Sequence, residues 1–330
     1  GNCLSVQAWV SMATGKNPAK HGVIDFWNVS ADRLQREFAS SRLIQGRTLW
    51  GILSQRGKKV GVVNVPVSYP PQEVNGYLLS GFLTPRDKTD YTYPPDLRAE
   101  ILQAVGDYAA DPYDPLSPSL HLLKEFIYWM GKREEANRYL LRKYPAEFFM
   151  NVVQALDHLQ HLFWKYLDVR HPRYDPKEAK KYRPLILECY RLADTIVGQR
   201  LEMLEEGDTL FIISDHGFGP AHKRFHVNRF LANLGLLTFQ EGTGSPFGSL
   251  LRQAGITPQR AREVMRRADI LGLRRHLMGR MARIGLSKRM KGVLTLPVDW
   301  SRTKAYSGSP ATEGIYVNLK GHEPQGIVEL

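Results

Sequence analysis

Cysteine, long hydrophobic runs and acidic residues are all scarce in this chain. Cys3 and Cys189 are its two cysteines among 330 residues, too few for a disulfide framework or a thiolate metal site. No apolar run approaches the ~18 residues that a membrane span needs. Neither an internal repeat nor a low-complexity tract is present. We therefore expect a soluble protein of a reducing compartment, and we predict a cytoplasmic location.

The shortage of acidic residues leaves 45 Lys and Arg against 33 Asp and Glu, a formal net charge of +12. Residues 251–292 hold twelve Lys/Arg against Glu263 and Asp269, a local balance of +10. The rest of the chain is close to neutral, which argues against sequence-specific nucleic-acid binding. The basic segment alternates arginines with apolar residues and predicts amphipathic helices. A solvated or lid-like face is the favoured interpretation, and contact with a membrane surface through 251–292 is the alternative.

Apolar segments alternate with helical patterns, which predicts an α/β fold with a largely parallel central sheet and helices on both faces. The expected strands are 59–65, 147–154 and 209–213, and the expected helices are 48–55, 117–143 and 176–206. Residues 66–115 are rich in Pro, Asp and Tyr and are expected to be mostly loop. We divide the chain into a catalytic core, 1–243 with an excursion at about 66–145, a basic helical insertion, 244–297, and a return to the core, 298–330.

Two polar motifs follow expected strands. Asp215 and His216 come directly after 209–213, at the strand end where open α/β sheets place ligands. Asp157 and His161 follow 147–154 and are four residues apart, so that one helix face carries both. Each motif alone is more often a turn or a surface pair than a site, but two such motifs at strand ends favour a site. Paired oxygen and nitrogen ligands suit Zn²⁺, with Mn²⁺ or Mg²⁺ as alternatives.

Four further stretches accompany these motifs: Ser5-Val6-Gln7-Ala8-Trp9, Thr14-Gly15, Asn17-Pro18-x-x-His21-Gly22 and Glu313 to Gly321. Taken together, these residues resemble the alkaline phosphatase superfamily. The most similar branch is that of type I phosphodiesterases and nucleotide pyrophosphatases, in its phosphomutase-like form. The resemblance implies that Ser5, nine residues before Thr14, is the nucleophile. Gln7 replaces the proline that the family usually has, and the sulfatase branch is disfavoured because Gln7 and Trp9 replace its Pro and Arg. Cys3 is then a small buried thiol.

The resemblance also implies two divalent ions and a phosphoserine intermediate in phosphoester hydrolysis. We assign Ser5, Asp215 and His216 to one ion and Asp157 and His161 to the other. His222 is a candidate substrate contact, whereas His21 is expected to be structural and His226 to open a helix. The family's upstream Asp and downstream His ligands are missing, so we expect an internal fragment that is itself inactive. The alternatives are a phosphomutase on the same fold and a non-catalytic basic module that binds anions or membranes.

Overall fold

The computed structural model describes residues 4–29, 36–112, 118–223, 225–240, 298–308 and 314–329. The chain divides into two compact units, Gly1–Phe225 and His226–Leu330, and each is described by itself. Among the described helices, none combines the length and the apolar character that crossing a bilayer requires.

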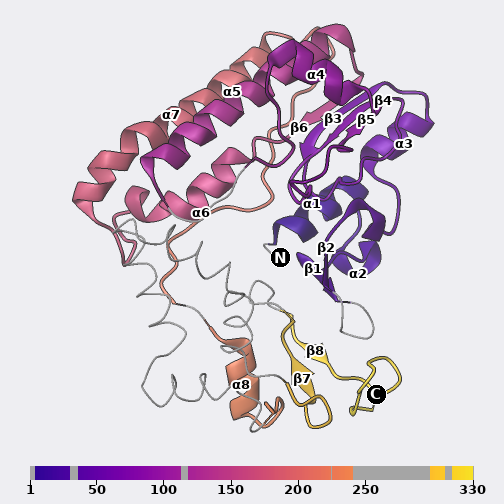
Figure 1. The fold of residues 1–330 in the computed structure, drawn as a ribbon, viewed down its shortest axis with the longest axis vertical. Helices are drawn as coiled ribbons and strands as arrows, with labels where there is room; N and C mark the ends of the chain where they lie inside the picture. Colours follow the sequence, from indigo (N-terminus) through magenta and orange to yellow (C-terminus); the bar gives the residue numbers. More distant parts are fainter. Residues whose placement is uncertain are drawn as a thin grey trace. The chain divides into compact units, whose positions relative to one another are not determined.

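The first unit contains most of the regular structure (Figure 1). Its helices are α1 (Ser5–Thr14), α2 (Pro18–His21), the 3₁₀ turn η1 (Ser41–Leu43), α3 (Leu49–Gln55), α4 (Leu97–Val105), α5 (Leu120–Lys143), α6 (Ala155–Leu167) and α7 (Pro176–Leu201). Its strands are β1 (Trp27–Val29), β2 (Arg36–Phe38), β3 (Val60–Val65), β4 (Gly76–Ser80), β5 (Thr92–Tyr93) and β6 (Phe148–Asn151). Strands β1 and β2 form an antiparallel pair of their own.

The central sheet has four strands in the order β5-β4-β3-β6. Strand β3 pairs in parallel with β4 on one side and with β6 on the other, and β5 closes the far edge in antiparallel orientation. All six residues of β3 are buried, as the continuous apolar run at 59–65 predicts for a strand covered on both faces. The sheet is therefore mostly parallel, and β3 and β6 match two of the expected strands.

Helices pack on both faces of this sheet. On one face, Val63 and Leu79 share a buried cluster with Ile101 of α4 and Leu140 of α5. On the other face, Val62 lies in a cluster with residues of α1 and α3, including the buried indole of Trp50. The two clusters come from alternate residues of the strands, because successive side chains point to opposite faces.

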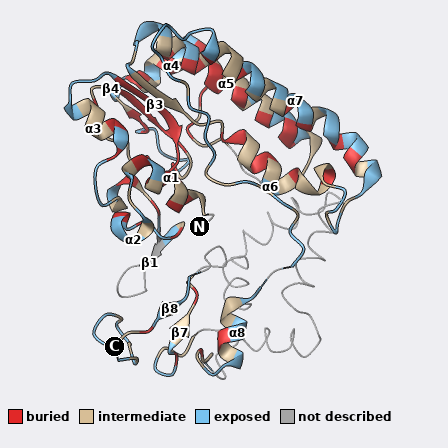
Figure 2. Cartoon of the chain, turned by 180° about the vertical axis from the view of Figure 1, so that it is seen from behind, coloured by how far each residue is buried: buried red, intermediate tan, exposed pale blue. Residues whose placement is uncertain are grey.

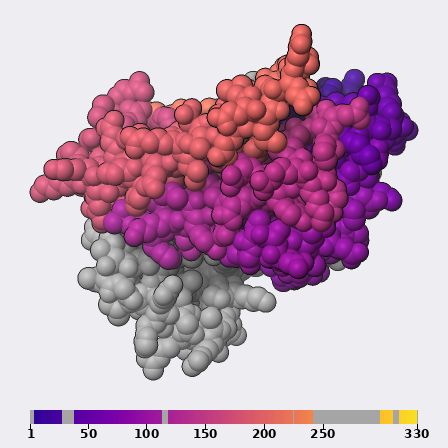
Figure 3. Space-filling view, turned by 90° about the horizontal axis from the view of Figure 1, so that it is seen from above, coloured from indigo at the N-terminus to yellow at the C-terminus, as the bar shows by residue number. Residues whose placement is uncertain are grey.

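Helices α5, α6 and α7 form a layer around their own apolar cluster, which includes Phe126, Phe163 and Ile186. Buried residues follow one stripe of α5 and of α7, with exposed residues outside (Figure 2), the pattern of an amphipathic helix. Figure 3 shows the layer from above, with the salmon surface of α7 running along the magenta surface of α5. A bidentate ion pair joins the same two helices, since Arg200 donates to both carboxylate oxygens of Glu134 at 2.9 and 2.6 Å.

Two sequence predictions are corrected. Residues 209–213 are not a strand: no ladder partner is present among the described residues, and Phe211, Ile212 and Ile213 are 79%, 73% and 53% exposed. An apolar composition favours a strand but does not supply the neighbour with which it must hydrogen-bond. Residues 66–115, expected as loop, contain β4, β5 and α4. Strand β4 is short and begins at a glycine inside a stretch rich in Pro and Asp. The sequence pattern there indicated a loop and not a strand.

The second unit contains helix α8 (Val227–Asn233) and an antiparallel pair of short strands, β7 (Ala305–Tyr306) and β8 (Tyr316–Val317). His226 is the N-cap residue of α8, which confirms that it opens a helix. The amide of Asn318 donates to the carbonyls of Trp300, Thr303 and Gln325 and so holds this unit's loops together. The predicted basic helical insertion at 244–297 lies outside the described residues.

Candidate metal and phosphoryl-transfer site

Ser5 is the first residue of α1. Leu4 occupies the N-cap position without a side-chain hydrogen bond to the helix, and Gly15 ends the helix in the left-handed conformation that favours glycine. Val6, Val10 and Ala13 bury one face of α1. The first N–H groups of a helix have no partner within it, and together with the helix dipole they attract anions. Ser5 thus places a hydroxyl at an end of the helix that suits a phosphate.

Asp157 and His161 lie on one face of α6, which begins four residues after the end of β6. Asp157 is in the first turn, where a carboxylate is favoured by the helix dipole. Its Oδ1 atom lies 3.3 Å from Nε2 of His161. The His161 side chain is 59% exposed and that of Asp157 is 31% exposed, so this pair borders solvent.

Asp215 and His216 are provided by the loop that follows residues 209–213. Nδ1 of His216 lies 3.1 Å from the carbonyl oxygen of Gly217, which can only accept, so Nδ1 carries a proton and, in the neutral ring, Nε2 is bare. This Nε2 atom is 3.0 Å from Oγ of Ser5, 3.4 Å from Oδ2 of Asp215 and 3.7 Å from Oδ1 of Asp157. Ser5, Asp157 and Asp215 therefore meet around one imidazole nitrogen, Nε2 of His216.

The donor set fits a divalent cation. Ligand atoms of Asp157, His161 and His216 all lie within 4.8 Å of one another. Oδ1 of Asp157 is shielded from solvent and has no hydrogen bond of normal geometry among the described residues. Two imidazoles and a carboxylate are a common set for catalytic zinc, and the Nδ1–H bond of His216 to a carbonyl is the usual way to orient a ligating imidazole. The Asp157 carboxylate raises the pKa of His161, because it favours the charged ring when only protons compete for it.

Aromatic rings line the same group. The ring of Phe218 is centred 4.8 Å from that of His161 and 5.1 Å from that of His216, and it stacks on Trp164 at 6.0 Å. Apolar rings beside ligating imidazoles limit their rotation and lower the local polarity. Phe218 follows His216 by two residues, and its contact with the imidazoles was not predicted from the sequence.

The remaining candidates lie elsewhere. His21 is fully buried: its Nδ1 accepts from the backbone N–H of Val23 at 3.2 Å, its Nε2 donates to Oγ of Ser11 at 3.0 Å, and burial lowers its pKa. Its structural role is confirmed. His222 is exposed, and among the described residues it interacts electrostatically with His171, after α6. Its contact with substrate stays a prediction, and Cys3 lies outside the described residues.

Three buried polar residues directly behind the site were not predicted from the sequence. Arg133, Gln154 and His158 are 5%, 5% and 8% exposed and contact one another. Burial lowers the pKa of His158 to about 4, so the ring is neutral at physiological pH. The one available signal was the helical period, which turns His158 inward with Leu159 while Asp157 and His161 face outward.

The α/β body gathers Ser, Asp and His side chains from the starts of two helices and from a loop, an arrangement suited to metal-assisted phosphoryl transfer. Comparison with protein families matches residues 2–289 to the type I phosphodiesterase / nucleotide pyrophosphatase family, so the chain belongs to that family, within the alkaline phosphatase superfamily. Membership implies phosphoester hydrolysis. The comparisons with curated proteins and with solved structures gave no match.

Proposed function

We propose that this protein is a metal-dependent phosphoester hydrolase in which Ser5 attacks phosphorus and becomes transiently phosphorylated. The observation that carries the proposal is the convergence of Ser5, Asp157 and Asp215 on Nε2 of His216. The ligand atoms of Asp157, His161 and His216 lie within 4.8 Å of one another. A structural salt-bridge cluster would not need a serine at the end of a helix that has no side-chain cap. A phosphoryl-transfer site needs both the nucleophile and the anion-binding helix end.

We assign Asp157 and His161 to one divalent ion and Ser5, Asp215 and His216 to a second. Bound ions, zinc in the first instance, would ionise the serine hydroxyl and offset the charge of the phosphoryl oxygens. The Nε2 atom of His216 is close enough to Asp157 to serve either group. The chain's own part is positioning: α1 holds Oγ of Ser5, and its first N–H groups offer donors for the phosphoryl oxygens.

The covalent step forms a bond from Oγ of Ser5 to phosphorus and breaks the bond to the leaving alkoxide, which takes up a proton. Water then attacks the phosphoserine, and the serine leaves and regains a proton. These two displacements return the enzyme unchanged and release phosphate or a phosphate monoester. The proposal does not extend to a particular substrate.

Ser5→Ala tests the nucleophile, and the chain offers a matched control. Ser11 lies on the same helix and its Oγ is also 3.0 Å from a histidine Nε2, that of His21. In an active form of the protein, we expect Ser5→Ala to lower kcat for a phosphoester by about 10³-fold or more and to abolish acid-stable labelling of the protein by ³²P substrate. Ser11→Ala should keep both. Turnover and labelling that survive in Ser5→Ala would sink the proposed mechanism.

A further inference from the structure

A chain of buried polar groups lies behind the candidate site. Nη1 of Arg133, on α5, donates to Oε1 of Gln154 at 3.4 Å, and the amide nitrogen of Gln154 lies 2.9 Å from Nε2 of His158. His158 also packs between two aromatic rings, edge-on to Phe82 and stacked on Phe126. Burying polar side chains to this degree costs folding free energy unless their hydrogen bonds are made. We therefore ask what these three linked residues hold in place.

The direction of each hydrogen bond follows from the groups involved. A guanidinium can only donate, so Gln154 must present its Oε1 atom to Arg133. Its NH₂ group then faces His158 and donates, which requires Nε2 of His158 to be bare and places the ring proton on Nδ1. Arg133 therefore sets the orientation of Gln154, and Gln154 sets the tautomer of His158.

The same glutamine forms the start of α6. Gln154 is the N-cap residue, and its side chain makes no cap hydrogen bond because it is engaged by Arg133 and His158. Its backbone carbonyl accepts the N–H groups of Asp157 at 3.1 Å and of His158 at 3.4 Å. Fixing Gln154 therefore fixes the turn that carries the Asp157 carboxylate.

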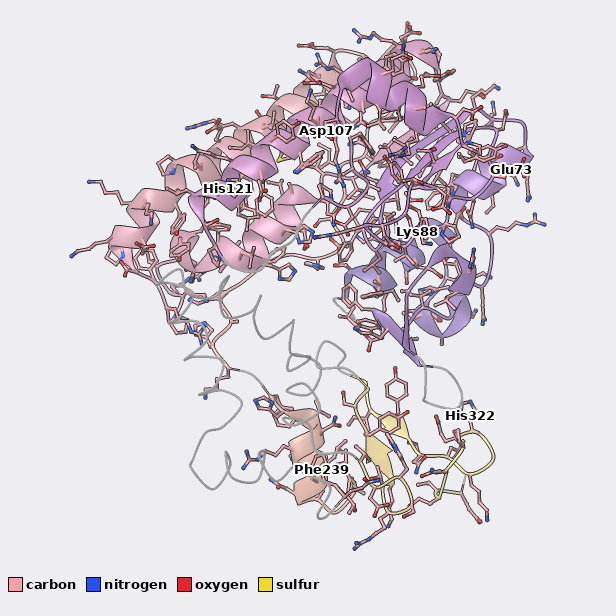
Figure 4. The ribbon with its side chains drawn as sticks, viewed as in Figure 1. Glu73, Lys88, Asp107, His121, Phe239 and His322 are labelled. Carbon is pink, nitrogen blue, oxygen red and sulfur yellow. The ribbon has the colours of Figure 1, made fainter. Side chains whose placement is uncertain are left out.

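Arg133 is in turn anchored to the sheet side of the unit. Its Nη2 donates to the carbonyls of Ala109 and Ala110. The neighbouring Tyr108 hydroxyl accepts from the amide of Asn64 at 2.8 Å, in β3. Asp107, labelled in Figure 4, accepts from the hydroxyl of Tyr128 on α5 at 2.9 Å. The loop after α4 thus links the end of β3 to α5. Arg133 in turn links α5 to the start of α6 through Gln154.

We propose that Arg133, Gln154 and His158 are positioning residues, which hold the first turn of α6 so that Asp157 and His161 present their ligand atoms together. This inference rests on the proposed function, because it gives that same site its support. His158, although adjacent to Asp157, is not itself a ligand: its Nε2 is committed to Gln154, and the group of ligand atoms within 4.8 Å comprises Asp157, His161 and His216.

Two substitutions of His158 separate the hydrogen bond from the ring. A glutamine carbonyl reaches the place of Nε2, so His158→Gln keeps an acceptor for Gln154, whereas His158→Asn reaches only the place of Nδ1. Zinc and manganese affinity of the purified full chain is measured by calorimetry, with kcat and KM alongside. We expect His158→Asn and Gln154→Met to weaken metal binding by about tenfold or more, as loss of supporting contacts does at metal sites, and His158→Gln to restore most of it.

Phe126→Leu is the control for general destabilisation, since it removes the ring stacked on His158 and leaves the polar chain intact. It should lower the melting temperature but not the metal affinity. Long-range ¹H–¹⁵N spectra of the metal-free protein should show His158 protonated on Nδ1, and the opposite tautomer would overturn the inference. Failure of the wild type to bind zinc or manganese would overturn the proposed function and the positioning role with it. Tight wild-type binding that His158→Asn and Gln154→Met leave unchanged would overturn the positioning role alone.

Discussion

Cys189 lies on the inner side of α7 and is fully buried. Burial raises the pKa of its thiol from 9.0 to about 12, because an anion would lose its hydration there. The thiolate is the reactive form of cysteine. This residue therefore serves packing and not chemistry, and it reports on the integrity of the helical layer.

Cys189 should make stability fall at alkaline pH. The raised pKa means that the unfolded chain loses the thiol proton first, so the contribution is complete below pH 9 and is lost as pH rises toward 12. In a Cys3→Ser background, the free energy of unfolding should fall with a slope of at most about 1.4 kcal/mol per pH unit relative to Cys189→Ala. Urea titrations at several pH values measure this. Identical pH profiles for the two variants, or rapid labelling of Cys189 in the folded protein, would contradict it.

Short motifs pointed to the Asp and His residues of the candidate site, whereas Ser5 was proposed from the family resemblance. Asp157 with His161 and Asp215 with His216 stand close in sequence, and their spacing after apolar runs indicates where they gather. Gln154 and Arg133 carry no such signal, because their contact joins residues 21 positions apart and depends on how α5 packs. Local sequence patterns indicate candidate ligands, but the residues that position those ligands depend on tertiary packing.

At the scale of elements, the long helices α5 and α7 were easier to predict than the strands. Ser119 and Asp175 cap α5 and α7 through their side chains, and both helices begin within three residues of the expected start. Such caps are local chemistry that sequence displays directly. Strand pairing is not local, which is why β4 was missed and 209–213 was assigned a ladder that it does not form.

Gly76, at the start of β4, makes the pairing of β3 with β4 sensitive to a single methyl group. It has φ of +140°, and a Cβ there would lie 2.1 Å from the carbonyl oxygen of Val60. Gly76→Ala should lower the free energy of unfolding by about 2–3 kcal/mol or more, from strain and from the clash. Denaturant titration measures the change, and a loss below about 0.5 kcal/mol would show that the strand pair can shift to admit the methyl group.

The control is Gly131, inside α5, where a Cβ would meet nothing within 4 Å. Gly131→Ala should raise the free energy of unfolding by about 0.5–1 kcal/mol, because alanine is the better helix former. The two substitutions add the same atom, so their opposite signs would isolate backbone conformation and close contact as the cause.

For the molecule as a whole, all five candidate site residues belong to the first compact unit. They come from α1, α6 and one loop, three segments that the sheet and the α5–α7 layer bring together. In the sequence, most of the excess positive charge falls in residues 251–292, which are beyond the described residues.

The exposed run at 211–213 affects how the protein behaves at high concentration. Its side chains face solvent, and β6 leaves one edge of the sheet without a strand partner among the described residues. Apolar strand-forming segments and open sheet edges are sites at which chains add to one another and precipitate.

Ile212→Lys should therefore lower light scattering as concentration rises, whereas Val169→Lys, at a site 71% exposed but outside the run, should do so far less. Equal effects of the two substitutions would point to overall charge as the cause. We therefore expect the segment that leads into Asp215 and His216 to limit the colloidal stability of the protein.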